Sequence, residues 1–440
     1  MTTNIILLTI DALRADHVSG YGYERQTTPF LDELASRAFV FEEAISASSH
    51  TREALPAILT GCYPSDAIAS DYTLNADSIA THLSDTHTSA AFHSNPYVSR
   101  AYNFDRDFDK FDDDMYLSRS RILALFQRAL DKFVLNRGEY HARAEEINKR
   151  SLEWLTSIGK EPFFLWNHYM DVHGPYNPPK GYTLGKSEMS SEEAQSLYQK
   201  TINAPEEVTE SERNQLVDTY DGEIRYLDRQ IKSLVNTLKE RSLFEESLVI
   251  VTADHGDAFD EHGYYTHPRQ LHDPLLRVPL IVSAPGSKRG KRIATPVSTL
   301  DIVPTILFSL DRMSEHLPGE ALMLIAEGED SVGDNTVFAS ATGEDENEGI
   351  RRFAARNRHW KAILERDLAS GEVLNERLFD LEDDPEESKP IKPDNADPRK
   401  IVTELRDFSQ QRLDPYSEDK DSEESPSNEV NERLKALGYK

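Results

Sequence analysis

Two carboxylates and an imidazole follow strand-like runs in distant parts of the sequence. Asp11 ends the run Asn4–Ile10, and Asp254 and His255 directly follow the run Ser247–Ala253. Buried parallel strands read as continuous apolar runs, and open α/β sheets bind ligands beyond the carboxyl ends of such strands. Two oxygen ligands and one nitrogen ligand suit Mn, Mg or Zn, whereas carboxylates alone would favour Ca or Mg. The pattern therefore predicts a divalent metal site typical of a hydrolase.

Thr51 carries a hydroxyl just before the helical stretch Ala54–Leu59. A hydroxyl in this place is most often a helix N-cap, although Ala54 lacks the acid that would complete a capping box. The alternative is a metal-activated nucleophile whose alkoxide is stabilised by the helix N-terminus. Arg52 is correspondingly either a surface charge or a clamp on an oxyanion. The residues alone leave both interpretations open.

Three further polar residues are candidates for substrate contacts. Asp171 and His173 follow the strand-like run Pro162–His168, and alternate residues of an extended chain point the same way. Both could therefore face the site, or Asp171 could be hydrogen-bonded within a turn. His267 would be structural on its own, but it lies close in sequence to Asp254.

Strand-like runs alternate with helical stretches through most of the chain, which predicts a mainly parallel sheet covered on both faces. The longest helix is expected over residues 210–240, with an apolar face at helical spacing. His93 and Asn95, at the end of the strand-like run Ser89–His93, are weaker site candidates. The other strand-like runs are Phe39–Ala44 and Val278–Ser283, and a further helix is expected over Pro29–Ala38.

The length of 440 residues predicts more than one domain. Acidic, glycine-containing stretches interrupt the alternation at Glu327–Asn335 and Gly343–Gly349, so we place a boundary near residue 330. The predicted units are a catalytic domain over 1–330, a smaller C-terminal domain over 331–415, and an acidic linker with a terminal helix over 416–440. The expected elements beyond the boundary are strands at Arg352–Leu364 and Val373–Leu381, a disordered linker at Ser417–Asn428 and a helix at Val430–Leu437.

The formal net charge is −29, from 78 acidic and 49 basic residues. Such a surface repels nucleic acid and anionic lipid, so neither is an expected partner. Distributed acidity also suits a halophilic protein from a salty cytoplasm, although an acidic mesophilic protein can look similar. The single cysteine excludes an intrachain disulfide.

A cytoplasmic location is expected from the ends and the hydropathy of the chain. The strand beginning at residue 4 leaves no room for a signal peptide, and no apolar run approaches the roughly 20 residues of a membrane span.

Taken together, these segments resemble the sulfatase family of the alkaline phosphatase superfamily. Any one segment is a weak match, but their joint order is highly specific. The matching segments are Asn4–Gly22, Thr51–Pro64, Asp171–Tyr176, Val251–Gly263, Arg277–Pro285, Thr299–Thr305 and Leu378–Glu387.

The resemblance implies an α/β fold: a large domain with a central mixed, mainly parallel sheet flanked by helices, and a smaller C-terminal α+β domain with an antiparallel sheet. It implies one divalent metal ion, Mn, Mg, Zn or Ca, held by Asp11, Asp254 and His255 with the nucleophile at its apex. Counting back from Leu59-Thr60-Gly61, the family nucleophile falls on Thr51.

The resemblance also implies the roles of the remaining candidates. His173 and His267 match positions that contact the transferred group or the leaving group. Arg52 does not stand at the family's arginine position, and we expect it to reach the site from another direction as a catalytic residue. Asp171 is grouped with the two histidines as a substrate-binding residue.

Three departures from the family pattern bear on the chemistry. Sulfatases oxidise a cysteine or serine to formylglycine, and Thr51 cannot give that aldehyde, so formylglycine is not expected. The arginine expected four residues later is Leu55, and the second acid of the early pair is Ala12. The lost carboxylate argues against a calcium site.

We therefore expect a metal-dependent hydrolase that cleaves sulfuric or phosphoric esters of small molecules or glycans through Thr51. The threonine is similar to that of phosphoryl-transferring relatives, so a phosphodiesterase or phosphotransferase is one alternative. Ala12 lacks a carboxylate, and Leu55 stands where the family has an arginine. These two losses favour another alternative, a non-catalytic homologue that binds anionic glycans.

Overall fold

The computed structural model describes residues 3–114, 141–185, 188–287, 289–312, 316–328, 335–343, 349–393 and 396–413. The linker predicted at 417–428 and the terminal helix predicted at 430–437 lie outside the described residues.

A nine-stranded mixed sheet forms the centre of the large domain, in the order β10-β2-β9-β6-β1-β5-β3-β4 with β11 beside β2. β9 runs antiparallel to both of its neighbours, and the other pairings are parallel. The predicted mixed, mainly parallel sheet is thereby confirmed. The strands are β1 (Asn4–Ile10), β2 (Phe39–Ile45), β3 (Thr88–Phe92), β4 (Lys110–Asp112), β5 (Phe163–Tyr169), β6 (Ser247–Ala253), β9 (Arg277–Ser283), β10 (Lys291–Ile293) and β11 (Val297–Ser298).

The register of the three central strands, β1, β5 and β6, aligns their carboxyl ends, so the residues that follow these strands lie side by side. Ile10 at the end of β1 pairs with Tyr169 of β5 on one side and with Ala253 of β6 on the other. Every residue of β1, β5 and β6 is buried, as expected for parallel strands covered on both faces. Asp11 and Asp254 therefore leave adjacent strands at the same level.

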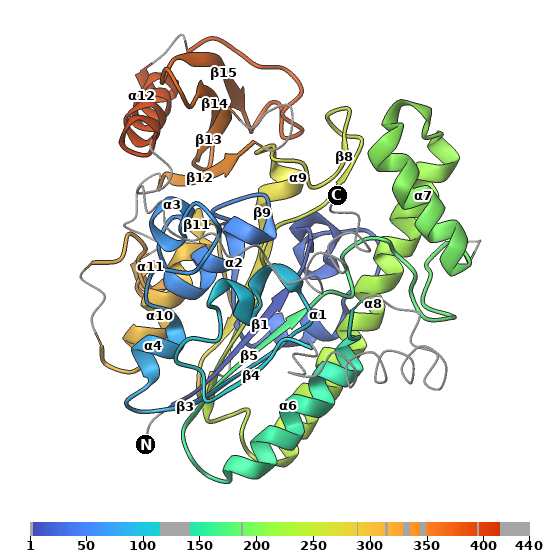
Figure 1. Ribbon diagram of the computed structural model, residues 1–440, viewed down its shortest axis with the longest axis vertical. Helices are drawn as coiled ribbons and strands as arrows, with labels where there is room; N and C mark the ends of the chain where they lie inside the picture. The colour runs from blue at the N-terminus through green and yellow to red at the C-terminus, as the bar shows by residue number, and fades with distance from the viewer. Residues whose placement is uncertain are drawn as a thin grey trace.

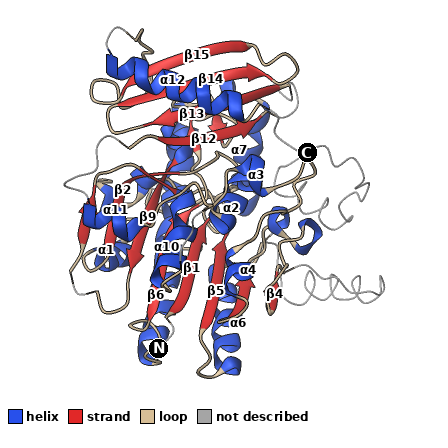
Figure 2. Cartoon of the chain, turned by 90° about the vertical axis from the view of Figure 1, so that its left-hand side faces the viewer, coloured by secondary structure: helices blue, strands red, loops and turns tan. Residues whose placement is uncertain are grey.

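Helices cover both faces of this sheet (Figures 1 and 2). α6 and α8 pack side by side on one face, and α2 and α10 pack together on the other. The helices are α1 (Pro29–Ala35), α2 (Thr51–Thr60), α3 (Pro64–Ala67), α4 (Ile79–Leu83), α6 (Ala144–Ile158), α7 (Ser191–Asn203), α8 (Glu210–Glu240), α9 (Asp273–Leu276), α10 (Ile302–Ser309) and α11 (Leu322–Gly328).

The longest of these helices, α8, confirms the helix predicted over 210–240. Thr209 and Glu212 form a capping box at its N-terminus, which satisfies backbone N–H groups that have no partner within the helix. Its apolar face is buried against the domain at Ile224, Leu227, Ile231, Leu234 and Leu238. No helix in the part of the chain that the structure describes is long and apolar enough to cross a membrane.

The C-terminal sheet is antiparallel, as the family resemblance implies. It consists of β12 (Val337–Thr342), β13 (Ile350–Arg356), β14 (Trp360–Asp367) and β15 (Val373–Asp380), and α12 (Ala396–Gln411) packs on its two central strands. The single strand predicted over 352–364 is in fact parts of two strands, β13 and β14. Asn357 makes the turn between them, because its side-chain oxygen accepts hydrogen bonds from the backbone of His359 and Trp360.

The small sheet lies over the end of the large sheet toward which β1 runs (Figure 2). Ser340 N of β12 donates to Ala47 O, at a distance of 2.9 Å. The chain between residues 329 and 334 lies outside the described residues, so the predicted boundary near residue 330 stays a prediction.

A buried lysine joins the two units. Lys361 of β14 is fully buried, and its ammonium nitrogen lies 2.6 Å from Asp273 Oδ1 of α9 and 2.5 Å from Glu387 Oε1. Glu387 is itself buried, and burial raises the pKa of its carboxyl group to about 7 even beside this lysine. Its negative charge therefore depends on the lysine.

Replacing Lys361 by Ala is expected to lower the free energy of unfolding by about 3–5 kcal/mol, because it strips a buried carboxylate of its partner. Urea denaturation followed by tryptophan fluorescence measures this change. Lys400→Ala is the control, because Lys400 is 67% exposed and pairs with Glu404 at 3.7 Å. That surface change should alter stability by less than about 1 kcal/mol, and equal losses in the two variants would contradict the assignment.

Candidate metal centre and nucleophile

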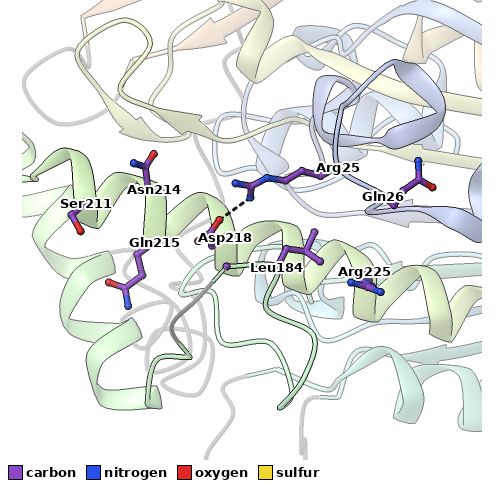
Figure 3. Close-up of a pocket in the computed structure, with 9 residues that line it drawn as sticks. Arg25, Gln26, Leu184, Ser211, Asn214, Gln215, Asp218 and Arg225 are labelled. Carbon is purple, nitrogen blue, oxygen red and sulfur yellow. Dashed lines mark hydrogen bonds and ion pairs between the residues drawn. The ribbon is translucent and has the colours of Figure 1, made fainter.

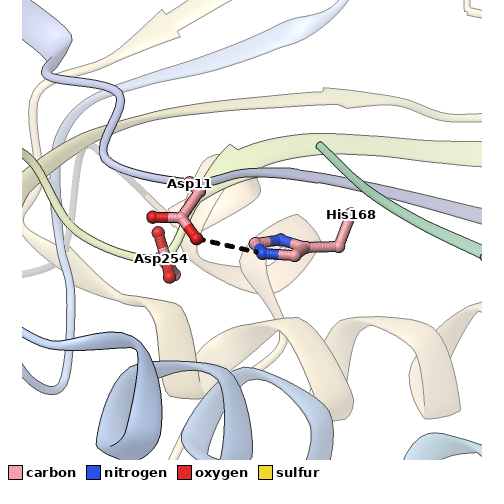
Figure 4. A group of neighbouring side chains, drawn as sticks. All are labelled: Asp11, His168 and Asp254. Carbon is pink, nitrogen blue, oxygen red and sulfur yellow. Dashed lines mark ion pairs between the residues drawn. The ribbon is translucent and has the colours of Figure 1, made fainter. Parts of the chain in front are cut away.

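Asp11, His168 and Asp254 gather where the central strands end (Figure 4). One ligand atom from each lies within 4.8 Å of the others, and all three side chains are fully buried. Asp11 leaves the end of β1, Asp254 leaves the end of β6, and His168 is the penultimate residue of β5. The structure thus brings together the two predicted carboxylates and adds an imidazole from the strand between them and β3.

The donor atoms of this cluster fit a divalent cation. Asp11 Oδ1, Asp254 Oδ2 and His168 Nε2 are buried and have no hydrogen-bond partner among the described residues. Burying a carboxylate without a partner costs several kcal/mol. Two carboxylates and an imidazole facing one another are a ligand set that Mn, Zn and Mg accept.

Electrostatics makes the two carboxylates unequal. Burial opposes ionisation of Asp11, but the imidazoles of His173, His168 and His255 outweigh it and hold the pKa of Asp11 below its usual range. Burial, followed by repulsion from Asp11, raises the pKa of Asp254 to about 7. A cation between the two groups would favour the charged form of both.

Hydrogen bonds from behind the cluster hold the carboxylates in place. Asp254 Oδ1 accepts from the backbone N–H of His255 at 2.8 Å and of Ala12 at 3.2 Å. Asn95 Nδ2 donates to Asp11 Oδ2 at 2.8 Å. In each carboxylate, one oxygen is therefore hydrogen-bonded to the surrounding protein, and the other belongs to the candidate metal site.

His168 is oriented in the same way. Its Nδ1 lies 3.0 Å from Thr9 Oγ1, and that hydroxyl accepts a hydrogen bond from Trp166 Nε1 at 2.9 Å. Its Nε2 faces Asp11 Oδ2 at 3.3 Å. Partners of this kind fix the ring orientation of metal-binding histidines.

Thr51 is the first residue of α2, and His50 is the N-cap. His50 Nδ1 accepts from the backbone N–H of Arg52 at 3.2 Å, so the interpretation of Thr51 as the cap is wrong. The helix begins one residue earlier than a threonine cap would require, which leaves the Thr51 hydroxyl available for other contacts. Thr51 Oγ1 lies 3.0 Å from His255 Nε2.

His255 connects the hydroxyl to the carboxylates. Its Nδ1 lies 2.8 Å from Gly256 O, an acceptor, so Nδ1 carries the proton. Burial lowers the pKa of this imidazole, which leaves Nε2 unprotonated in the neutral ring. Nε2 therefore accepts from Thr51, and it lies 3.7 Å from Asp11 Oδ1 and 3.6 Å from Asp254 Oδ2.

The other predicted histidines lie beside this group. The ring centroid of His267 is 4.6 Å from that of His255, 5.0 Å from that of His173 and 5.6 Å from that of His50. His173 Nδ1 lies 2.7 Å from Gly174 O and so donates to it.

The match to the sulfatase family model spans residues 3–311, which is more than half of the chain. The chain belongs to the sulfatase family. It is accordingly a hydrolase of sulfuric or phosphoric esters.

One curated relative and two solved structures match most of the chain. The arylsulfatase of Clostridium perfringens is 24% identical over 88% of this chain and 89% of its own length. BT4656, solved in complex with D-glucosamine-2-N,6-O-disulfate, has a TM-score of 0.73 at 17% identity and covers 96% of this chain and 100% of its own. The phosphonate monoester hydrolase SpPMH from Silicibacter pomeroyi has a TM-score of 0.71 at 19% identity, covering 93% of this chain and 95% of its own. These similarities confirm the fold.

The structure shows what occupies two positions at which this sulfatase departs from the family pattern. Leu55 is fully buried in the hydrophobic core, so that turn of α2 brings no charge to the site. Ala12 has a φ of 58°, and its N–H binds Asp254 instead of its side chain adding a carboxylate.

Arg52 is held between two aromatic rings. Its guanidinium carbon lies 4.1 Å from the ring centroid of Tyr97 and 4.7 Å from that of Tyr72. The Tyr97 ring lies 5.6 Å from the His50 ring, so Arg52 stays near the nucleophile end of α2. Cation–π contacts of this kind limit the positions that an arginine side chain can reach.

Asp171 is not brought to the imidazole cluster. Its carboxylate accepts from the backbone N–H of Ala144 at 3.0 Å, at the start of α6, and lies 3.2 Å from Arg143 Nε. The chain turns after β5, where His173 N donates to Met170 O. Asp171 and His173 therefore do not point the same way as they would on an extended strand.

His168 was outside the predicted site, and Asn95 was only a weak candidate. The signal for His168 is an imidazole, a side chain that can bind metals, near the end of a fully buried strand. A cavity of about 660 Å³ beside α8 contains no member of the cluster (Figure 3). There Arg25 is already paired with Asp218 at 2.8 Å and with Asp221 at 2.9 Å.

Proposed function

We propose that this sulfatase is a metal-dependent hydrolase that cleaves sulfuric or phosphoric esters through the hydroxyl of Thr51. The observation that carries the proposal is the 3.0 Å contact between Thr51 Oγ1 and His255 Nε2, directly beside the carboxylates Asp11 and Asp254. A hydroxyl at a helix N-terminus, next to a candidate cation site, meets the requirements of an activated nucleophile.

Asp11, Asp254, His255 and Thr51 hold the metal ion in this proposal, and His168 completes the set. The buried donor atoms without hydrogen-bond partners support this ligand set. Two imidazoles favour Mn or Zn over Ca, which prefers oxygen ligands alone. The bound cation supplies positive charge that lowers the pKa of a coordinated hydroxyl.

The chain's own residues carry out the transfer in two steps. Thr51 Oγ, which has released its proton to solvent, forms a bond to sulfur or phosphorus while the bond to the leaving alcohol breaks, and the protonated imidazole of His267 or His173 gives its proton to the leaving oxygen. Water then attacks the covalent intermediate, the same imidazole accepts a proton of that water, and Thr51 leaves as the alkoxide. Arg52 balances charge on the non-bridging oxygens.

The substrate proposed is a small-molecule or glycan ester. BT4656 binds a sulfated glucosamine, and SpPMH is a phosphonate monoester hydrolase, so both sulfur and phosphorus centres occur among the structural neighbours. Thr51 itself favours phosphoryl chemistry as a second candidate, because formylglycine cannot form from threonine.

A matched panel of 4-nitrophenyl sulfate, phosphate, phosphonate and phosphodiester tests the proposal, with Mn, Zn, Mg and Ca supplied in turn. We expect turnover of at least one ester, with the highest rate in Mn or Zn. High salt should support the assay, because it screens the self-repulsion of a chain with net charge −29. Metal binding without turnover of any ester would indicate a non-catalytic homologue.

Thr51→Ala should abolish turnover while leaving the unfolding temperature within a few degrees of the wild type, because the side chain lies at the start of a helix capped by His50. Thr51→Ser is the matched control, since it keeps the hydroxyl and should keep measurable activity. Initial rates and thermal unfolding give both readouts. Full activity in the alanine variant would remove Thr51 from the mechanism.

Asp254→Asn and His168→Gln should each lower metal affinity by about 10-fold or more, measured by elemental analysis and titration calorimetry. His87→Gln is the control, because His87 is a buried histidine of the same domain that contacts Thr3 O at 2.9 Å, outside the cluster. If His168→Gln binds metal as tightly as the control, His168 is not a ligand. The same result for Asp254→Asn would refute the site.

A further inference from the structure

A buried aspartate and a tyrosine stand behind His267. Asp257 Oδ1 lies 2.9 Å from His267 Nδ1, and the other oxygen, Oδ2, accepts a hydrogen bond from the hydroxyl of Tyr176. Asp257 is fully buried, His267 is 6% exposed and Tyr176 is 3% exposed. No role in the chemistry described above has been given to Asp257 or Tyr176.

The local fold fixes this arrangement. β7 (Ala258–Phe259) and β8 (Tyr265–Thr266) form a short antiparallel pair, in which Ala258 is opposite Thr266. Asp257 and His267 directly flank that pair and are therefore brought face to face. Arg14 Nη1 donates to the backbone oxygen of Asp257 at 3.0 Å, which anchors the hairpin to the loop that follows Asp11.

The hydrogen bond to Asp257 fixes which ring nitrogen of His267 carries the proton. Tyr176 donates to Asp257, so the carboxylate is the acceptor in both contacts, and His267 Nδ1 carries the proton. Nε2 lies across the ring from Nδ1, and the ring centroids of His255, His173 and His50 lie 4.6–5.6 Å from that of His267. Thr51 Oγ1 is in hydrogen-bond contact with the nearest of these rings, that of His255.

We propose that Asp257, held by Tyr176, is a positioning residue that fixes the ring orientation and the tautomer of His267, so that Nε2 exchanges the proton of the leaving alcohol. This inference rests on the proposed function and selects His267 over His173 as the proton donor. His267 enters this step as the imidazolium, with a proton on each ring nitrogen; as the P–O or S–O bond to the leaving group breaks, the proton on Nε2 passes to the leaving oxygen and the neutral ring stays protonated at Nδ1. When water attacks the Thr51 ester, its proton returns to Nε2.

Dependence on the leaving group distinguishes this role from a structural one. An alkyl-like or phenyl leaving group needs protonation, whereas 2,4-dinitrophenolate is stable as an anion. Asp257→Asn keeps the shape of the side chain but can present its amide N–H₂ to His267, which would impose the wrong tautomer. We expect kcat/KM of Asp257→Asn to fall about 100-fold for the phenyl ester and less than about 5-fold for the dinitrophenyl ester.

Tyr176→Phe provides a second, milder variant, because it removes only the hydrogen bond that fixes Asp257. It should lower the phenyl rate several-fold and leave the dinitrophenyl rate unchanged. Asp228→Asn is the matched control: Asp228 is another buried aspartate, which accepts from the backbone of Phe30 and Leu31 at the start of α1. Its two rates should fall equally or stay unchanged.

Long-range ¹H–¹⁵N correlation of ¹⁵N-histidine-labelled protein reads the tautomer without any substrate, with His267→Gln used to assign the signal. The wild type should show His267 protonated at Nδ1, and Asp257→Asn should shift the proton toward Nε2. Equal losses for the two esters, or no loss, would overturn the proposal. If the wild type turns over neither ester, the proposed function fails, and an unchanged His267 tautomer in Asp257→Asn would then overturn this inference separately.

Discussion

The repulsion between two buried carboxylates is the constraint on which the site depends. Because β1 and β6 pair with Ile10 opposite Ala253, Asp11 and Asp254 leave the sheet at one level, with ligand atoms within 4.8 Å. Two unit charges about 4 Å apart repel by roughly 4 kcal/mol at the effective dielectric of a protein. Imidazoles, backbone N–H groups and the amide of Asn95 around the two carboxylates partly offset this repulsion. A cation would complete the compensation that these neutral and partly charged groups begin.

The helix that begins at Thr51, α2, is held against this centre from outside the large sheet. Glu53, two residues after Thr51, accepts from Ser48 Oγ at 2.7 Å and lies 3.3 Å from Arg269 Nη1. Its other oxygen accepts from the backbone N–H of Thr342 at the end of β12. One buried carboxylate therefore ties the start of α2 to the loop that carries His267 and to the C-terminal sheet. The small sheet acts in this way as a support for the site.

The sequence allowed the strands and the two carboxylates to be predicted because both depend on local patterns. The apolar runs before Asp11 and Asp254 are long enough to be recognised, and parallel pairing then dictates that the acids meet. His168 was missed because it lies inside its strand, not after it, and only the pairing with β1 shows that its ring faces Asp11. Asp171 was predicted to point the same way as His173 because the chain after β5 was taken to be extended. The chain turns there instead, and the Asp171 carboxylate accepts a hydrogen bond at the start of α6. Side-chain direction beyond a strand end is set by long-range contacts that no local pattern encodes.

The two departures at Ala12 and Leu55 are best understood together. One removes a negative ligand and the other removes a positive charge four residues after the nucleophile, so the paired loss leaves the net charge of the site unchanged. In the proposed site His168 would add a ligand atom without adding a charge when its ring is neutral, and that ring is anchored by Thr9 and Trp166. Together with the proposed ligand His255 it would give a mixed nitrogen and oxygen site, which softer divalent metals prefer. A bound metal lowers the pKa of a coordinated hydroxyl, which suits the plain hydroxyl of Thr51 as the proposed nucleophile.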